Sequence, residues 1–162
     1  MVKAVGTEGS SHRLAWPDLA GRMDGGRHVL PVRVYFEDTD FSGVVYHGAY
    51  VRFLERGRSD FLRLAGVGHD ELARGDHGEP LAFTVRRLSI EFVKSARIDD
   101  VIEIATEVTA LSGARLSLGQ TVIRADTILV TADVEVAIIT DAGVPRRLPA
   151  SIRDKLPSPA VG

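Results

Sequence analysis

A chain of 162 residues with a formal net charge of −2 fits one domain and has no overall positive field to attract nucleic acid or anionic membranes. Its composition, 44% apolar and 26% charged, is typical of a globular protein that buries a core. The absence of cysteine excludes disulfides, thiolate catalysis and cysteine-based metal sites. No apolar run approaches the roughly 18 residues of a membrane-spanning helix. We therefore expect no membrane insertion.

The two ends of the chain differ from its middle. Residues 1–27 are rich in glycine, serine and charge, and they show no sustained helical or strand period, so we predict a flexible extension. Charged residues also interrupt every apolar patch there, which argues against a secretory signal and favours a cytoplasmic location. Residues 157–162 are expected to fray. The domain is predicted to span residues 28–156.

The first regular pattern in the domain is a strand followed by a helix. Residues 29–36 alternate and are rich in valine and aromatic side chains, which is typical of a strand. A polar loop over residues 37–43 follows. The next apolar residues recur at helical spacing, and Gly66 and Gly68 are expected to end this helix of about five turns. The apolar positions are Tyr50, Phe53, Leu54, Gly57, Phe61, Leu64 and Ala65.

Beyond the helix the pattern changes to a period of two. Strands are predicted over residues 83–93, 101–111, 115–125 and 128–140, joined mostly by short turns. In the last strand every even position from Ile128 to Ile138 is apolar, so one face is expected to be buried. One helix followed by four strands predicts an α+β fold in which the helix lies across a curved antiparallel sheet of about five strands.

Three carboxylates gather in the loop before the helix, at Glu37, Asp38 and Asp40. A helix N-terminus presents unpaired backbone N–H groups and a positive dipole end, which can stabilise the oxyanion of a tetrahedral intermediate. A carboxylate beside such a site can attack a carbonyl or take a proton from water. The loop therefore has the groups that acyl transfer needs.

Carboxylates in this position could also cap the helix or bind a metal ion. Glu37 and Asp38 suit a structural or solvent-facing role, since carboxylates before a helix are common caps. Residues 38–43 also match the opening of a calcium loop, but its twelfth position is Ala49 where a glutamate is needed. A metal site combining His47 with the carboxylates lacks a second histidine at suitable spacing. We expect no metal and no organic cofactor.

The loop and its surroundings resemble the hotdog-fold thioesterases, a group that includes 4-hydroxybenzoyl-CoA thioesterase and the Tol-Pal-associated acyl-CoA thioesterases. The likeness covers roughly residues 30–155. The segments that carry it are Val32–Asp40, Gly43–His47 with Tyr50, Phe53–Arg58, Phe83–Arg87, Glu91-Phe92, Ala96–Asp100 and Leu148-Pro149. The resemblance implies one long helix wrapped by an antiparallel sheet that dimerises edge to edge, often with further assembly to a tetramer.

The resemblance also implies roles for individual residues. Asp40 would be the catalytic carboxylate, the backbone N–H of His47 would be the oxyanion donor, and Tyr46 and His47 would flank the thioester. Tyr46 could pack against the acyl chain or fix a hydrogen bond. Further substrate contacts are expected at Gly43, Val44, Val45, Tyr50, Arg86 and Arg97, the two arginines as candidates for the phosphates of CoA. Glu55 is expected to pair with an arginine on the helix surface.

Together these features predict hydrolysis of an acyl-CoA thioester to a free acid and CoA. Asp40 would act as a nucleophile, through a mixed anhydride, or as a general base on water. Two alternatives stay open. One is a hotdog hydratase or dehydratase, although such enzymes need a histidine–carboxylate arrangement for proton transfer at carbon. The other is a non-catalytic acyl-CoA-binding protein or a partner in an envelope complex, as the Tol-Pal resemblance suggests.

Overall fold

A computed structural model describes residues 19–160 of the chain. Its elements, in chain order, are β1 (Arg22–Asp24), β2 (Arg27–Arg33), the short 3-10 helix η1 (Phe36–Asp38), α1 (His47–Leu64), α2 (His69–Arg74), β3 (Ala82–Phe92), β4 (Val101–Ser112), β5 (Arg115–Arg124), β6 (Thr127–Ile139) and α3 (Ala150–Arg153). The strands form one sheet in the order β1-β2-β4-β5-β6-β3, with antiparallel neighbours throughout.

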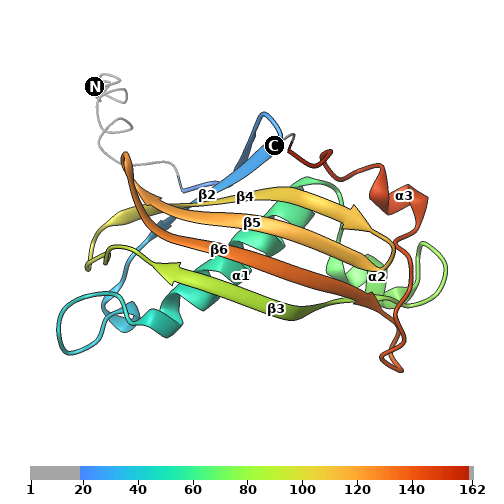
Figure 1. The fold of residues 1–162 in the computed structure, drawn as a ribbon, viewed down its shortest axis with the longest axis horizontal. Helices are drawn as coiled ribbons and strands as arrows, with labels where there is room; N and C mark the ends of the chain where they lie inside the picture. The colour runs from blue at the N-terminus through green and yellow to red at the C-terminus, as the bar shows by residue number, and fades with distance from the viewer. Residues whose placement is uncertain (1–18, 161–162) are drawn as a thin grey trace, which may run out of the picture.

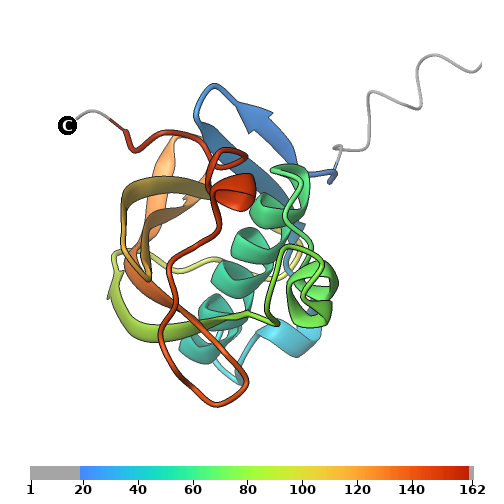
Figure 2. The same cartoon turned by 90° about the vertical axis from the view of Figure 1, so that its right-hand side faces the viewer.

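The sheet curves around α1, which crosses its concave face (Figures 1 and 2). This arrangement follows from the amphipathic pattern of the helix, because Tyr50, Phe53, Leu54 and Phe61 are buried against the strands. The helix ends where Gly66 takes a positive φ of 81° and its amide bonds to the carbonyl of Arg63. The predicted α+β fold is confirmed.

The core has two buried clusters along α1. The first surrounds Phe53 and Leu54 in the N-terminal part of the helix and includes Ile102 and Ile104 of β4. The second surrounds Phe61 and Leu62 nearer the C-terminal end of the helix. The predicted buried face of β6 is confirmed from Val130 to Ile138, whereas Ile128 at the start of the strand is 48% exposed. Leu64, expected on the buried face of the helix, is 45% exposed.

Two boundaries in the N-terminal part of the chain differ from the prediction. The first strand ends at Arg33, because the chain turns into η1 and leaves Tyr35 and Phe36 exposed. The ordered fold also begins before residue 28, since β1 pairs with β2 through a two-residue turn at Gly25-Gly26. The predicted extension is therefore wrong for residues 22–27, and residues 1–18 lie outside the described residues.

The segment that follows the last strand packs back against the fold. Leu156 is buried, and the amide of Ala160 donates a hydrogen bond to the carbonyl of Val108 at 3.0 Å. The expected fraying from residue 157 is therefore not seen up to Ala160, and residues 161–162 lie outside the described residues. The short helices α2 and α3 were not predicted. Within residues 19–160, no helix has both the length and the apolar character needed to cross a membrane.

Candidate active site

The acidic loop closes as a tight turn between η1 and α1. The amide of Asp40 donates to the carbonyl of Val44, and the amide of Gly43 donates to the carbonyl of Asp40, both at 3.0 Å. Gly43 has a φ of 80°, a left-handed conformation that glycine adopts without steric strain. The turn places the side chain of Asp40 at the base of the loop, only partly exposed to solvent.

The carboxylate of Asp40 is held by Ser42. Its Oδ1 accepts a hydrogen bond from the backbone amide of Ser42 at 2.8 Å and a second from the Ser42 hydroxyl. These two bonds lower the pKa of Asp40, with smaller contributions from the amide of Val44 and the charge of His47, and they outweigh the opposing effect of desolvation. Asp40 is therefore ionised at neutral pH, which both candidate roles require.

The start of α1, seven residues after Asp40, leaves backbone donors unpaired. Tyr46 is the N-cap and makes no side-chain capping bond. Its amide donates to the carbonyl of Asp38, and the amide of Ala49 donates to the carbonyl of Tyr46. The amides of His47 and Gly48, in the first turn of the helix, have no acceptor among the described residues. They are the donors available to a developing oxyanion.

Aromatic rings surround these donors. The ring of Tyr46 lies 4.3 Å from the ring of His47, and His47 meets Phe92, at the end of β3, edge to face at 6.3 Å. Both Tyr46 and His47 are exposed. A β-carbon added at Gly48 would lie 2.6 Å from Cε1 of Tyr46, so the position of this ring depends on a glycine at residue 48.

Ala96 fastens both the loop and the helix to the body of the fold. Its carbonyl accepts a hydrogen bond from the amide of Val45, and its amide donates to the hydroxyl of Tyr50, each at 2.9 Å. Isolated bridges join Thr39 to Val45 and Val44 to Arg97. The loop is therefore held by backbone contacts within itself and with residues 96 and 97.

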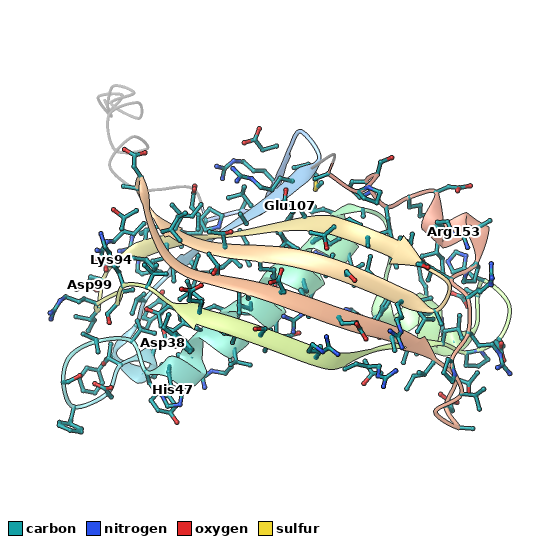
Figure 3. All side chains as sticks on the ribbon, viewed as in Figure 1. Asp38, His47, Lys94, Asp99, Glu107 and Arg153 are labelled. Carbon is teal, nitrogen blue, oxygen red and sulfur yellow. The ribbon has the colours of Figure 1, made fainter. Side chains whose placement is uncertain are left out.

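Asp38 and Glu37 differ in their environments. Asp38 is 4% exposed, and its Oδ2 accepts a hydrogen bond from the amide of Tyr35 at 2.9 Å. This geometry supports the structural role expected for Asp38. Glu37 is exposed, which fits the expected contact with solvent. Figure 3 shows that the side chains of Asp38 and His47 lie at the same end of the molecule, near the end of β3.

The structure brings most of the predicted site residues together, and the exceptions are Val45, Tyr50 and Arg86. Val45 and Tyr50 are buried at 4% and 3% exposure, and the Tyr50 hydroxyl is engaged, so the geometry favours a supporting role for them over contact with substrate. Arg97 is exposed beside the loop. Arg86 lies at the bulge in the middle of β3, away from the acidic loop.

Glu55 also differs from its prediction, because its carboxylate accepts a hydrogen bond from Ser59 at 2.8 Å and forms no ion pair with an arginine among residues 19–160. Within the same part of the chain, no group of histidine and acidic residues is arranged to hold a metal ion.

Several residues that shape the site were missed. A serine two residues after an aspartate is a known turn pattern, so Ser42 could have been found from the sequence. The need for a glycine at residue 48 has only a weak signal in the sequence, namely the large side chain of Tyr46 two positions earlier. No local signal marks Ala96 or Phe92, since their contacts with the loop and helix come from residues distant in the chain.

Comparison with known proteins identifies the family. The sequence profile of the Thioesterase superfamily matches residues 42–131, starting two positions after Asp40. The acyl-CoA thioester hydrolase YbgC of Escherichia coli O6:H1 is 43% identical over 124 residues, which cover 75% of this chain and 90% of that protein. The acyl-CoA thioesterase YbgC of Haemophilus influenzae is 39% identical over 110 residues, 68% of this chain and 79% of that protein.

A solved structure supports the same conclusion. The crystal structure of a probable thioesterase from Bartonella henselae superposes with a TM-score of 0.74 at 49% sequence identity, covering 76% of this chain and 99% of that one. The hotdog fold implied by the sequence resemblance is confirmed. The chain belongs to the Thioesterase superfamily and is a thioesterase.

Proposed function

We propose that the chain hydrolyses acyl-CoA thioesters to a free carboxylic acid and CoA, with Asp40 as the catalytic carboxylate. The observation that carries the proposal is an ionised, Ser42-anchored Asp40 in the loop that leads into α1, whose first-turn amides, those of His47 and Gly48, are unpaired. The names of the YbgC relatives, which are acyl-CoA thioesterases, support the substrate class.

The chemistry of this arrangement has two parts. The thioester carbonyl oxygen would accept hydrogen bonds from the amides of His47 and Gly48, which stabilise the negative charge of the tetrahedral intermediate. Asp40 would attack the carbonyl carbon or remove a proton from the attacking water, and either role needs its ionised form. The thiolate of CoA then leaves and takes up a proton. The general-base route gives the free acid at this step, whereas in the nucleophilic route a water molecule hydrolyses the mixed anhydride to release the acid and restore Asp40. Tyr46 and His47 would flank the reacting group.

The test is a thiol-release assay with CoA thioesters of short, long and aromatic acids. We expect at least one of them to be hydrolysed with saturation kinetics, and Asp40→Asn to abolish most of that turnover. Single-turnover hydrolysis in ¹⁸O-labelled water tests for the nucleophilic role of Asp40. Label in the Asp40 carboxylate requires attack of water on the Asp40 carbon of a mixed anhydride, whereas the general-base route places the label only in the released acid. Absence of thiol release from the whole set would overturn the proposal.

We further propose that the protein is a homodimer joined through β3. This strand lies at the edge of the sheet and pairs, among the described strands, only with β6. The strand carries exposed apolar residues, with Val85 at 46% and Phe92 at 49% exposure. A long unpaired edge with apolar side chains readily pairs with a second copy. Antiparallel pairing of the two edges would continue the sheet.

Measurement of the molar mass in solution tests the dimer. Val85→Lys puts a charge on the proposed interface and should shift the mass toward that of a monomer. Ile128→Lys is a matched control, because Ile128 is equally exposed at 48% but lies at the start of β6. A monomeric wild-type protein would contradict the proposal. A tetramer, a cytoplasmic location and a link to the Tol-Pal system stay predictions from the sequence.

A further inference from the structure

Arg58 is a buried cation with an incomplete set of partners. The residue is 9% exposed and lies on the side of α1 that faces the sheet. Its Nη1 donates to Oε1 of Gln120 at 3.0 Å. No carboxylate oxygen of the described residues lies within 4.0 Å of its guanidinium nitrogens. Buried charges are ordinarily paired, so this one calls for a partner.

The contact with Gln120 fixes the guanidinium in place. Gln120 is itself 2% exposed, and its Nε2 donates to the carbonyl of Leu54 and to the hydroxyl of Thr106, both at 2.9 Å. Every polar atom of this amide side chain is therefore engaged, and its oxygen is directed toward Arg58. Burial lowers the pKa of Arg58, an effect that the charge of Glu55 opposes. The network holds a desolvated cation in a defined position.

A cavity of about 120 Å³ opens beside Arg58, between α1 and the sheet. Its floor is apolar and comes from Leu116, Leu118 and Val136, all of them buried. Apart from His28 Nδ1, no buried side-chain nitrogen or oxygen in the described part of the chain lacks a partner. The Arg58 nitrogens that make no hydrogen bond are therefore accessible, and Arg58 is one of the residues that line the cavity.

The size and lining of the cavity limit what it can hold. An apolar cavity of about 150 Å³ in another protein accommodates benzene, so the volume here suits an acyl chain of a few carbons. The apolar floor suits the methylene groups of such a chain. The accessible guanidinium suits a carboxylate at its far end, because hydrogen bonds between guanidinium and carboxylate are among the strongest in proteins. Glu55 also lines the cavity, but it is exposed to solvent and its carboxylate accepts a hydrogen bond from Ser59.

In the proposed dimer, the cavity of one copy would lie close to the active site of the other. His47 contacts Phe92 at the end of β3, whereas the cavity is lined by Phe83 and Val85 near the start of that strand. Antiparallel pairing of two β3 edges brings the end of one strand beside the start of the other. In the proposed dimer each cavity would therefore lie next to the catalytic loop of the other copy.

We propose that Arg58 is a specificity-determining residue that pairs with a carboxylate at the far end of the acyl group, so that the preferred substrates are CoA thioesters of short dicarboxylic acids. The inference rests on the proposed thioesterase function and deepens it. A neutral acyl group of the same shape would leave the buried guanidinium unpaired. Sites built to hydrogen-bond a polar group discriminate strongly against analogues that lack it.

The experiment compares two substrates that differ only at the end of the chain. Glutaryl-CoA carries a terminal carboxylate, and 5-methylhexanoyl-CoA replaces it with an isopropyl group of similar shape. We expect the wild-type kcat/KM to favour glutaryl-CoA by at least about 100-fold. Arg58→Gln, which can still donate to Gln120, should remove this preference, and Arg58→Lys should retain part of it.

Arg56→Gln is the matched control, because Arg56 is exposed two positions earlier on the same helix and does not line this cavity. It should leave the ratio of the two kcat/KM values unchanged. A wild-type enzyme that hydrolyses both substrates equally, or prefers the neutral one, overturns the inference but leaves the thioesterase function standing. If Arg58→Gln lowers both rates equally, Arg58 is only structural. If no acyl-CoA of any kind is hydrolysed, the proposed function fails as well.

The wild-type comparison stands even if the variants do not fold.

Discussion

The hydroxyl of Tyr50, in α1, accepts a hydrogen bond at 2.9 Å from the backbone amide of Ala96, 46 residues further along the chain. Both residues are buried, and the carbonyl of Ala96 also accepts the amide of Val45. Ala96 thus holds the acidic loop and the helix in a fixed relation through its own carbonyl and amide. The arrangement of Asp40 relative to the amides of His47 and Gly48 depends on this connection.

Removal of the Tyr50 hydroxyl should therefore weaken the fold and the site together. Tyr50→Phe leaves the amide of Ala96 buried without an acceptor, and we expect a loss of about 1–3 kcal/mol in the free energy of unfolding, measured by urea denaturation. The thioesterase kcat should fall as well. Tyr46→Phe is the stability control, since that side chain is 47% exposed. Equal stability of the two variants would contradict the role given to Tyr50.

The two aspartates of the loop should respond differently to the same substitution. Asp40→Asn keeps an oxygen for the Ser42 bonds but removes the charge, so we expect kcat to fall by at least about 100-fold with little change in stability. Asp38→Asn affects a buried carboxylate that accepts the amide of Tyr35, and it should mainly lower the melting temperature. Kinetics and thermal unfolding of both variants test this. Near wild-type turnover of Asp40→Asn would exclude Asp40 as the catalytic group.

Ser42 should set the acidic limit of activity. Its hydroxyl and amide lower the pKa of Asp40, so the wild-type enzyme keeps Asp40 ionised and active well into the acidic range. Ser42→Ala removes the hydroxyl bond and should raise that pKa, which moves the acidic limb of the kcat/KM profile to higher pH. A looser carboxylate should also lower the neutral-pH rate by roughly 10- to 100-fold. An unchanged acidic limb would show that Ser42 does not tune Asp40.

Gly48→Ala should separate activity from stability. Alanine is the better helix former by about 1 kcal/mol, so the fold should be unchanged or slightly more stable. The new methyl group would lie 2.6 Å from the Tyr46 ring and displace it, so we expect kcat/KM to fall at least about tenfold. Gly57→Ala should instead lower the stability of the fold, because its methyl group would lie 2.7 Å from Ile104 of the core. Full activity of Gly48→Ala would show that the Tyr46 position is unimportant.

A buried histidine should make stability depend on pH. Nε2 of His28 lies 2.7 Å from Oδ2 of Asp60, and its Nδ1 is buried with no partner in the described part of the chain. Burial, assisted by the charge of Arg63, lowers the pKa of His28 from 6.5 to about 4. A second proton on Nδ1 would be a buried donor without an acceptor, which agrees with this direction.

Since the folded pKa of His28 is below the unfolded one, the unfolded chain binds the extra proton between about pH 6.5 and 4. The free energy of unfolding should therefore fall with falling pH across this window, by about 3 kcal/mol in total, and be unaffected above it. Urea denaturation at neutral pH and near pH 5 measures the slope. His28→Gln, whose amide can still donate to Asp60, should show a smaller slope, and identical slopes would contradict the assignment.

Local patterns in the sequence determined most of the helices and strands and the place of the acidic loop. The spacing from Tyr50 to Phe61 predicts the long helix, alternation predicts the four later strands, and the acidic run places Asp40 before a helix start. These features depend on the period of a single element, which one segment of chain carries by itself. The Asp24-Gly25-Gly26 turn was an equally local signal for β1 that the prediction did not use.

Only the tertiary structure decided which residues support the loop and which side chains are buried. Ala96 reaches Tyr50 across 46 residues, and Arg58 meets Gln120 across 62, so neither contact has a local signature. Arg58 looks like any other charged helix residue in the sequence, yet the curvature of the sheet encloses it beside a cavity. The acidic loop that the sequence singled out is thus completed by contacts that exist only once the sheet has wrapped around the helix.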